Sequence, residues 1–280
     1  MKIIDNIKEI QSKVLDIRNS GFSVGFVPTM GALHQGHLSL LERSVSDSDI
    51  SICSIFVNPI QFNNNKDLEK YPRTFDDDCQ LLENAHCDIV FAPSVGEMYP
   101  EKVKASYDFG RLEQLMEGEH RPGHFNGVAV VVKKLLEICL PHKAYFGEKD
   151  FQQLMIIREL VKKEHFDIEI IGCPIIREPD GLAMSSRNVR LTTTQRALAP
   201  EIFNTLEWMK RKAGKLSVPV ILEQAQTRLG NLPGIEVEYI QLADENTLVS
   251  VNGWNDAENI RAFIALFLGE VRLIDNMKIT

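Results

Sequence analysis

Short apolar runs alternate with amphipathic helical segments over the first 176 residues of this chain, and this alternation constrains the fold most strongly. Strands are expected at residues 21–28, 49–57, 88–93 and 166–176, and a further strand with its terminal loop at 143–150. Helices are expected at residues 3–19, 38–48, 75–87, 124–140 and 151–164. The order is typical of an α/β protein with a Rossmann-like, doubly wound parallel sheet and right-handed crossovers.

The pattern changes in the last third of the chain. Two helices are expected at about 193–213 and 217–230, followed by strands at 235–244 and within 259–276. The sequence therefore predicts two domains. Residues 1–176 form the Rossmann-like domain, and residues 177–280 form a smaller C-terminal α+β domain.

Composition excludes several classes of partner. The 280-residue chain has 31 basic and 39 acidic residues, a formal net charge of −8, so we expect no nucleic-acid partner and only local groups to bind anions. No apolar stretch reaches 18 residues, so we expect no membrane segment. The N-terminus carries Asp5 and Glu9 and does not resemble a signal peptide. The five cysteines are scattered and are expected to be reduced thiols of a cytoplasmic protein.

Three unusual loops each follow an expected strand. They read "PTMGALHQGH", "NPIQF" and "GEKD". Ligands of open parallel sheets bind outside the carboxyl ends of the strands. The position of these loops therefore predicts one shared site.

The first loop carries His34 and His37 around Gly36, after an expected strand that ends at Pro28. Glycine allows close approach of a phosphate, a helix N-terminus attracts anions, and imidazoles can donate hydrogen bonds to developing charge. The alternative is an ordinary pair of polar loop histidines. A zinc pair is disfavoured because other obvious ligands are few.

A second candidate is the segment Met184–Asn188, which reads "MSSRN" after a "PDG" turn. Two hydroxyls, an arginine and an amide can surround a triphosphate, with the arginine supplying charge-assisted hydrogen bonds. The alternative is a turn with a serine as helix N-cap.

Three further loops have both a functional and an ordinary interpretation. In 147–150, Lys149 can neutralise phosphate and Asp150 can organise Mg²⁺ through water, or the segment is a surface turn. Arg121 and His124 in "RPGHFNGV" can meet an anion at a helix end, or form an ordered connection. The amides of 58–62 can bind hydroxyl or carboxylate groups, or the segment is a proline turn.

The acidic run at residues 76–78 is expected to form the solvated first turn of a helix, where negative charge suits the helix dipole.

The motifs are more specific together than singly. "PTMGALHQGHLSL", "FVNPIQF", "HRPGHFNGV", "GEKDFQQL" and "DGLAMSSRN" occur in this order along the chain. Over essentially its whole length, the sequence closely resembles the pantothenate synthetase family, the pantoate–β-alanine ligases. That family belongs to the nucleotidylyltransferase group, which is related to class I aminoacyl-tRNA synthetases.

The resemblance implies a two-step reaction. The pantoate carboxylate attacks the α-phosphorus of ATP to give pantoyl adenylate and pyrophosphate, and β-alanine then displaces AMP to give pantothenate. It also implies Mg²⁺, a homodimer, nucleotide and pantoate binding by residues 1–176, and a lid role for 177–280. We further expect the stretch 63–71 to form a flexible cover, because an acyl adenylate hydrolyses readily in water.

The resemblance also assigns site residues. The catalytic residues implied are His34, His37, Lys149 and Arg187, with His37 as proton donor. The ATP-binding residues implied are Met30, Gly31, Ala32, Leu33, His34, Gln35, Gly36, His37, Gly147, Glu148, Lys149, Asp150, Ile176, Met184, Ser185, Ser186 and Arg187. The pantoate- and β-alanine-binding residues implied are Pro28, Met30, Gln61, Arg121, His124 and Gln153. The metal would be held through water by Asp150.

Rival functions remain open at this point. An adenylyltransferase acting on a phosphorylated acceptor shares the His-x-Gly-His chemistry but explains Gln61 and Gln153 less well. A non-catalytic nucleotide-binding module could use the same fold. A dinucleotide oxidoreductase is disfavoured because the first strand is not followed by Gly-x-Gly-x-x-Gly.

Overall fold

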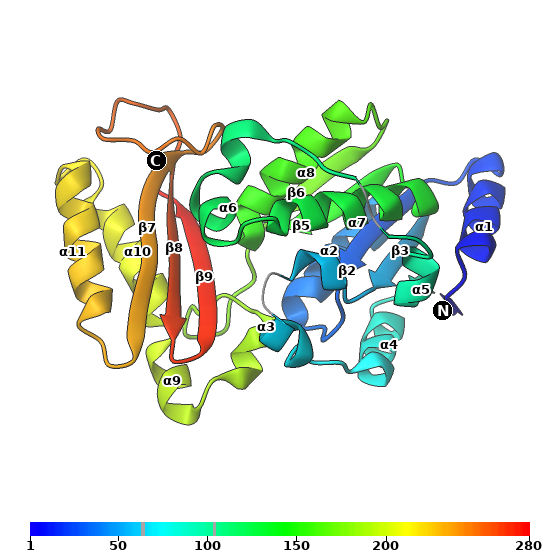
Figure 1. The fold of residues 1–280 in the computed structure, drawn as a ribbon, viewed down its shortest axis with the longest axis horizontal. Helices are drawn as coiled ribbons and strands as arrows, with labels where there is room; N and C mark the ends of the chain where they lie inside the picture. The colour runs from blue at the N-terminus through cyan, green and yellow to red at the C-terminus, as the bar shows by residue number, and fades with distance from the viewer. Residues whose placement is uncertain (63–64, 103–104) are drawn as a thin grey trace. The chain divides into compact units, whose positions relative to one another are not determined.

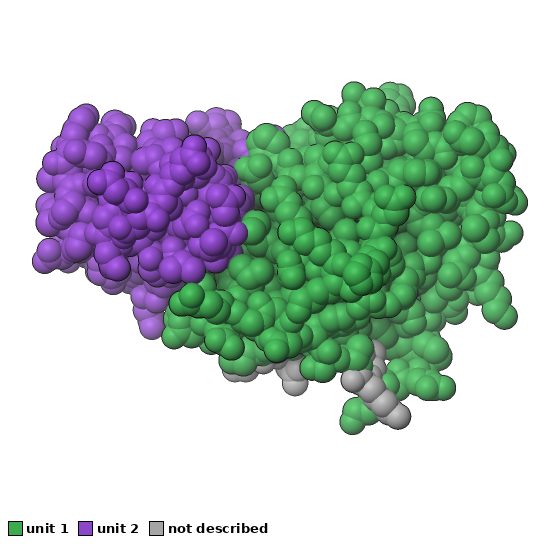
Figure 2. Space-filling view, turned by 90° about the horizontal axis from the view of Figure 1, so that it is seen from above, with its two compact units in different colours: residues 1–148, 152–174 green, residues 149–151, 175–280 purple. Residues whose placement is uncertain are grey.

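The computed structural model describes residues 1–62, 65–102 and 105–280. It divides into two compact units, coloured separately in Figure 2. Unit 1 contains residues 1–148 and 152–174, and unit 2 contains residues 149–151 and 175–280. The functional division at residue 176 stays a prediction.

Unit 1 is built on a six-stranded parallel sheet (Figure 1). Its strands are β1 (Lys2–Ile4), β2 (Val24–Thr29), β3 (Ile50–Ile55), β4 (Ile89–Phe91), β5 (Lys143–Gly147) and β6 (Glu169–Cys173). The strand order is β1-β4-β3-β2-β5-β6, and every paired strand is parallel to its neighbour. The predicted doubly wound α/β fold class is therefore confirmed.

Helices cover both faces of this sheet. The helices in this part of the chain are α1 (Ile7–Asn19), α2 (Gln35–Asp47), α3 (Asn65–Glu69), α4 (Phe75–Asn84), α5 (Val95–Met98), α6 (Met116–His120), α7 (His124–Cys139) and α8 (Phe151–Lys163), with 3₁₀ turns η1 (Pro59–Gln61), η2 (Gly110–Glu113) and η3 (Glu148–Asp150). Successive strand residues point to opposite faces. Phe26 accordingly joins a core with residues of α1, α7 and α8, whereas Val27 joins a core with residues of α2 and α4.

Several expected boundaries in unit 1 shift by a few residues, and two of these shifts have a clear physical cause. The helix predicted at 3–19 begins only at Ile7, because residues 2–4 pair in parallel with β4 and Asn6 caps the helix. The strand predicted to end at Pro28 continues to Thr29. β5 pairs only with Gly25 and Phe26, so no paired partner on that side needs a Pro28 N–H. Residues 63–64 of the predicted cover lie outside the described residues.

Unit 2 packs helices on a three-stranded antiparallel sheet of order β7-β8-β9 (Figure 1). Its elements are η4 (Ser186–Arg190), α9 (Thr193–Leu198), α10 (Glu201–Lys212), α11 (Val218–Gly230), β7 (Ile235–Asp244), β8 (Ile260–Leu268) and β9 (Val271–Lys278). Leu206 and Leu229 from the helices share a core with Ile264 of the sheet. The single helix predicted at 193–213 is two helices, because Pro200 lacks the N–H that would continue the hydrogen-bond ladder.

Candidate active site

The two histidines lie at the junction of β2 and α2, as the sequence predicted. His34 is the N-cap of α2, and the turn forms a reciprocal cap. The Gly36 N–H donates to His34 Nδ1 at 3.1 Å, and the His34 N–H donates to His37 Nδ1 at 3.3 Å. The ring centroids lie 4.0 Å apart. Because both Nδ1 atoms accept hydrogen bonds, each neutral ring carries its proton on Nε2 as a donor.

A buried carboxylate also holds this turn through hydrogen bonds to its backbone. The sequence did not single out this residue. Asp78 is 1% exposed and accepts hydrogen bonds from the Ala32 N–H at 2.9 Å and the Leu33 N–H at 2.7 Å. The Thr74 hydroxyl donates to it at 3.2 Å. At Gly31, where φ is +76°, an added Cβ would lie 2.9 Å from Asp78 Oδ2.

The expectation of a solvated acidic run is therefore wrong for Asp78, whereas Asp76 and Asp77 are exposed. Two amides of the turn bind a carboxylate of this chain instead of being left for a phosphate. An anion at this turn would therefore meet the two imidazoles rather than the Ala32 and Leu33 amides.

The candidate pantoate residue Gln61 lies in η1 within a tight polar cluster of unit 1. Its Nε2 donates to Met30 Sδ at 2.9 Å, and its Oε1 accepts from Asn58 Nδ2 at 3.1 Å. His124 Nδ1 lies 2.9 Å from the Gln61 carbonyl, and Arg121 Nη1 lies 3.2 Å from His124 Nε2. Since arginine only donates, His124 accepts through Nε2 and donates from Nδ1 to Gln61. The structure thus brings together four of the predicted substrate-binding residues.

A glycine allows this cluster to form. A Cβ built on Gly127 would lie 2.5 Å from the Ile60 carbonyl oxygen and 2.6 Å from Gln61 Cα. The buried Asn58 side chain also donates to the Gly127 carbonyl at 3.2 Å. Helix α7 therefore sets the position of Gln61 through direct backbone contact. Only Gly127 within "HFNGV" hinted at this in the sequence.

The second predicted pantoate residue, Gln153, is half-buried in α8 of unit 1. Its neighbour Gln152 has a structural role instead. Gln152 is 3% exposed, donates to the Leu112 and Leu115 carbonyls, and accepts from the Glu117 N–H. The two adjacent amides of "FQQL" therefore face different surroundings. Gly147 ends β5 and Glu148 follows it, both in unit 1.

The phosphate-binding candidates Lys149 and Asp150 belong to unit 2. Lys149 Nζ lies 3.9 Å from Asp150 Oδ2, and the Asp150 side chain is 51% exposed. Asp150 can offer one carboxylate, which suits Mg²⁺ because proteins often bind this ion through one or two carboxylates together with substrate phosphates. Among the described residues, no group of three or more His, Cys, Asp or Glu side chains could hold a metal ion.

The "MSSRN" segment follows a short hairpin in unit 2. The Met184 N–H donates to the Ile176 carbonyl at 3.0 Å, and an isolated bridge joins Arg177 to Ala183. Ser185 caps η4 by accepting from the Arg187 N–H at 3.3 Å, which confirms the N-cap alternative for this serine. Because its oxygen only accepts in this contact, the hydroxyl proton remains a donor for phosphate.

The cysteines are not candidate nucleophiles. All five are free thiols, as predicted, and four are buried. Burial raises the pKa of Cys87 to about 12 and also raises the pKa of Cys53 and Cys139. These thiols therefore stay protonated near neutral pH. No helix in the described part of the chain is long and apolar enough to cross a membrane.

Fold and site together define an α/β enzyme with paired histidines at a helix N-terminus. The model of the family Pantoate-beta-alanine ligase matches residues 2–278. The chain therefore belongs to the pantoate–β-alanine ligase family, and it is an enzyme that forms a carbon–nitrogen bond.

Relatives support the same assignment. The chain is 50% identical to the pantothenate synthetase of Bacteroides fragilis over 278 residues, which is 99% of each chain. It is 40% identical to the pantothenate synthetase crystal structure from Thermus thermophilus, with a TM-score of 0.94 and coverage of 100% and 99%. The pantoate–β-alanine ligase of Francisella tularensis, solved with beta-gamma ATP and β-alanine, is 39% identical, with a TM-score of 0.82 and coverage of 99% and 97%.

Proposed function

We propose that the chain condenses pantoate with β-alanine in two steps, through pantoyl adenylate, with ATP as the activating substrate. The pantoate carboxylate forms a bond to the α-phosphorus of ATP, and pyrophosphate leaves. The β-alanine amine then attacks the acyl carbon, AMP leaves, and the amine proton passes to solvent or a nearby base. The observation that carries this proposal is the pair of imidazoles in unit 1 whose Nδ1 atoms accept backbone hydrogen bonds, which assigns the proton of each neutral ring to Nε2.

The chemistry of the first step explains the paired imidazoles. The step joins two anions, so donors must offset their repulsion and stabilise the charge that develops on the phosphate oxygens. His34 and His37 supply two Nε2–H donors, and we assign the main transition-state role to His37. The Met30–His37 turn lines the nucleotide in this proposal, with Gly31 and Gly36 permitting close approach.

The cationic candidates lie in unit 2. Lys149 and Arg187 supply charge to the phosphates, and the Ser185 and Ser186 hydroxyls add donors. Gly147, Glu148, Ile176 and Met184 complete the proposed nucleotide contacts. Asp150 would hold Mg²⁺ through water, and the ion would supply positive charge to the phosphates of ATP.

Pantoate recognition is assigned to the Gln61 cluster. Gln61 and Gln153 hydrogen-bond the hydroxyl and carboxylate groups, and Pro28 and Met30 line the apolar side of the substrate. The amides disfavour analogues that lack these groups, because such analogues leave polar atoms unpaired. His124 and Arg121 hold the Gln61 backbone through the chain of hydrogen bonds described above.

Three further properties complete the proposal. We expect a homodimer, which light scattering tests, and a monomer mass would refute it. We expect a cytoplasmic location, consistent with five free thiols, which cell fractionation tests. We expect a requirement for Mg²⁺, which chelation with and without added Mg²⁺ tests.

The decisive experiment measures pyrophosphate release from the purified chain with ATP, Mg²⁺ and pantoate, with and without β-alanine. We expect a single burst without β-alanine and continuous formation of AMP and pantothenate with it, identified by mass spectrometry. Pyrophosphate release that ignores pantoate and requires a phosphorylated acceptor would favour the adenylyltransferase instead. Absence of release with any acceptor would favour a nucleotide-binding module.

A further inference from the structure

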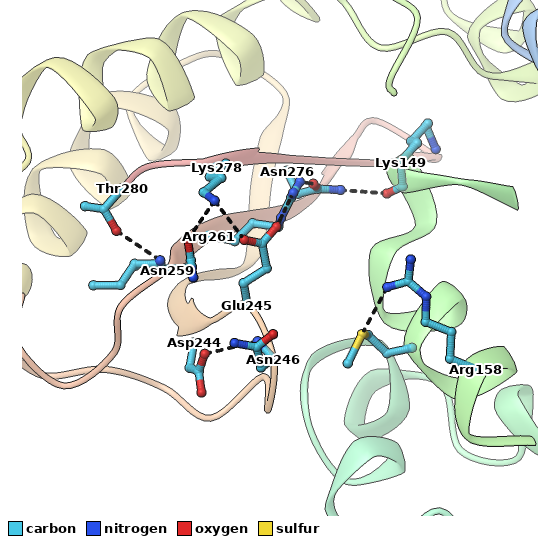
Figure 3. Close-up of polar contacts among 12 residues, drawn as sticks. Lys149, Arg158, Asp244, Glu245, Asn246, Asn259, Arg261, Asn276, Lys278 and Thr280 are labelled. Carbon is cyan, nitrogen blue, oxygen red and sulfur yellow. Dashed lines mark hydrogen bonds and ion pairs between the residues drawn. The ribbon is translucent and has the colours of Figure 1, made fainter. Parts of the chain in front are cut away.

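Segment 149–151 is held by the last strand of unit 2, far away along the chain. Asn276 of β9 donates from Nδ2 to the Lys149 carbonyl at 2.9 Å, a contact across 127 residues (Figure 3). Asn276 is 2% exposed. A buried amide therefore holds the backbone of the proposed phosphate-binding lysine.

A buried arginine sets the orientation of that amide. Arg261 of β8 donates from Nη1 to Asn276 Oδ1 at 2.6 Å and from Nη2 to Glu245 Oε1 at 2.6 Å (Figure 3). Its guanidinium also lies over the Phe151 ring, 4.1 Å from the centroid. Because arginine has no acceptor, it faces the oxygen of Asn276 and leaves Nδ2 directed at Lys149.

The adjacent residue holds the hairpin that precedes the other anion-binding candidate of unit 2, the segment 184–188. Asp275, which is 4% exposed, accepts from Arg177 Nη1 at 2.6 Å and from Nη2 at 3.0 Å. Arg177 also donates to the Gly181 carbonyl at 3.0 Å, which closes the hairpin that precedes Met184. A bidentate arginine–carboxylate pair fixes the relative orientation of the two side chains as well as their distance.

We propose that Asp275 and Asn276 are positioning residues that hold the two phosphate-binding segments of unit 2 on one strand. Neighbouring side chains of a strand point to opposite faces, so a single dipeptide can reach two separate segments. Asn276 places Lys149 through its carbonyl, and Asp275 places the hairpin leading to Arg187. This inference rests on the proposed roles of Lys149 and Arg187 toward ATP.

The test is a double-mutant cycle between Asn276→Asp and Lys149→Ala. Asn276→Asp keeps the acceptor for Arg261 and removes the donor to Lys149. The measured quantity is the single-turnover rate of pyrophosphate release with ATP and pantoate. We expect Asn276→Asp to lower this rate about 10- to 100-fold, the size of a misplacement near 1 Å, with the KM for pantoate unchanged. In the Lys149→Ala background it should cause less than about a twofold further loss.

Lys278→Ala is the matched control. It lies on the same strand and touches the same network through Glu245 at 3.5 Å, but its side chain is half exposed. We expect its rate to stay within about twofold of the unmodified chain. Asn276→Ser, which is smaller and uncharged, is the second variant in case Asn276→Asp does not fold, and it should show the same lack of additivity.

The second arm pairs Asp275→Asn with Arg187→Ala. Asp275→Asn should lower the rate in the unmodified background, lose its effect in the Arg187→Ala background, and keep its effect in the Lys149→Ala background. Equal losses of Asp275→Asn in all three backgrounds would show that Asp275 only supports stability, and an undiminished loss of Asn276→Asp in the Lys149→Ala background would show the same for Asn276. Either result would overturn the inference.

The outcomes separate this inference from the proposed function. If the unmodified chain releases pyrophosphate with pantoate but Lys149→Ala and Arg187→Ala are as fast, the assigned phosphate roles fail. If those variants are slow and the Asn276 and Asp275 variants are not, the positioning inference alone fails.

Discussion

The two units hold their candidate ligand-binding loops with buried or partly buried carboxylates, but the partners of those carboxylates differ. In unit 1, Asp78 binds two backbone amides of the turn that carries the histidines. In unit 2, Asp275 and Glu245 bind the guanidinium groups of Arg177 and Arg261. Amide donors are fixed by the local backbone, whereas an ion pair depends on both charges. The unit 1 turn therefore depends on the acceptor atoms of one buried side chain, whereas the unit 2 segments depend on both members of each ion pair.

The largest effect is expected at the histidine turn. His37→Ala should lower kcat about 100- to 1000-fold, or about 3 to 4 kcal/mol, with little change in ATP binding, because it removes a transition-state donor. His37→Gln is the control, since glutamine at this helix position can still accept from the cap residue. Recovery of kcat in His37→Gln would reduce the role of His37 to capping. Burst kinetics and ATP titration measure the two quantities.

A change of shape alone should disturb the Gln61 cluster. Gly127→Ala should lower kcat/KM for pantoate about 10- to 100-fold, because its Cβ would push the backbone of residues 60–61. Gly230→Ala is the matched control, since it adds a Cβ at the end of α11 in unit 2 with no atom within 4 Å. Steady-state kinetics with varied pantoate decide the result. An unchanged kcat/KM for pantoate in Gly127→Ala would show that the close contact between Gly127 and residues 60–61 does not contribute to pantoate specificity.

Removing the charge of Asp78 tests whether amide donors suffice to hold the turn. Asp78→Asn should lower the free energy of unfolding by about 1 to 3 kcal/mol, because one acceptor oxygen is replaced by an NH₂ group. That buried NH₂ group then faces one of the backbone N–H groups that the carboxylate accepted from. Asp77→Asn, one residue away and exposed, should stay within about 0.5 kcal/mol. Urea denaturation measures both. Equal stability of the two variants would contradict the anchoring role.

The smallest effect concerns pH in unit 2. Burial alone raises the pKa of Glu245, but the hydrogen bonds and charges of Arg261 and Lys278 outweigh it and leave the pKa below its ordinary value of 4.5. A carboxyl group whose pKa is lower in the folded than in the unfolded protein stabilises the fold at pH values above its unfolded-state pKa. This contribution is lost as the pH falls through the folded-state pKa.

Glu245→Gln should therefore reduce stability at pH 7, and the difference from the unmodified chain should shrink below about pH 4.5. Thermal unfolding at several pH values measures this difference. Glu258→Gln, at an exposed position, is the control. A difference that is constant over the whole range would mean that the Glu245 charge does not contribute.

The local spacing of apolar residues was sufficient to predict most of the strands and helices. Apolar runs and helical spacing predicted the parallel sheet, because strands buried on both faces must be apolar almost throughout. The exception was β1, whose three residues are too few to show a strand period beside the longer helical pattern. The break at Pro200 was also missed, since the apolar spacing continues across it.

The candidate site divides in the same way. His34, His37, Gln61 and Lys149 stood out because unusual polar residues followed expected strands. Asp78, Gly127 and Asn276 did not, although each fixes the position of one of those residues. An aspartate in the first turn of a helix is ordinarily solvated, and nothing near Asn276 in sequence points to a partner 127 residues away.

The sequence by itself determined the main alternation of strands and helices in unit 1 after β1, the family, and the side chains that can meet an anion. These depend on residue type and spacing over a few positions. Only the tertiary structure decided which tautomer the histidines carry, which carboxylate lies beneath their turn, and which strand holds Lys149. Those properties arise from contacts between distant segments. Burial makes such contacts strong constraints, because a polar group that loses its partner there cannot form a hydrogen bond to water instead.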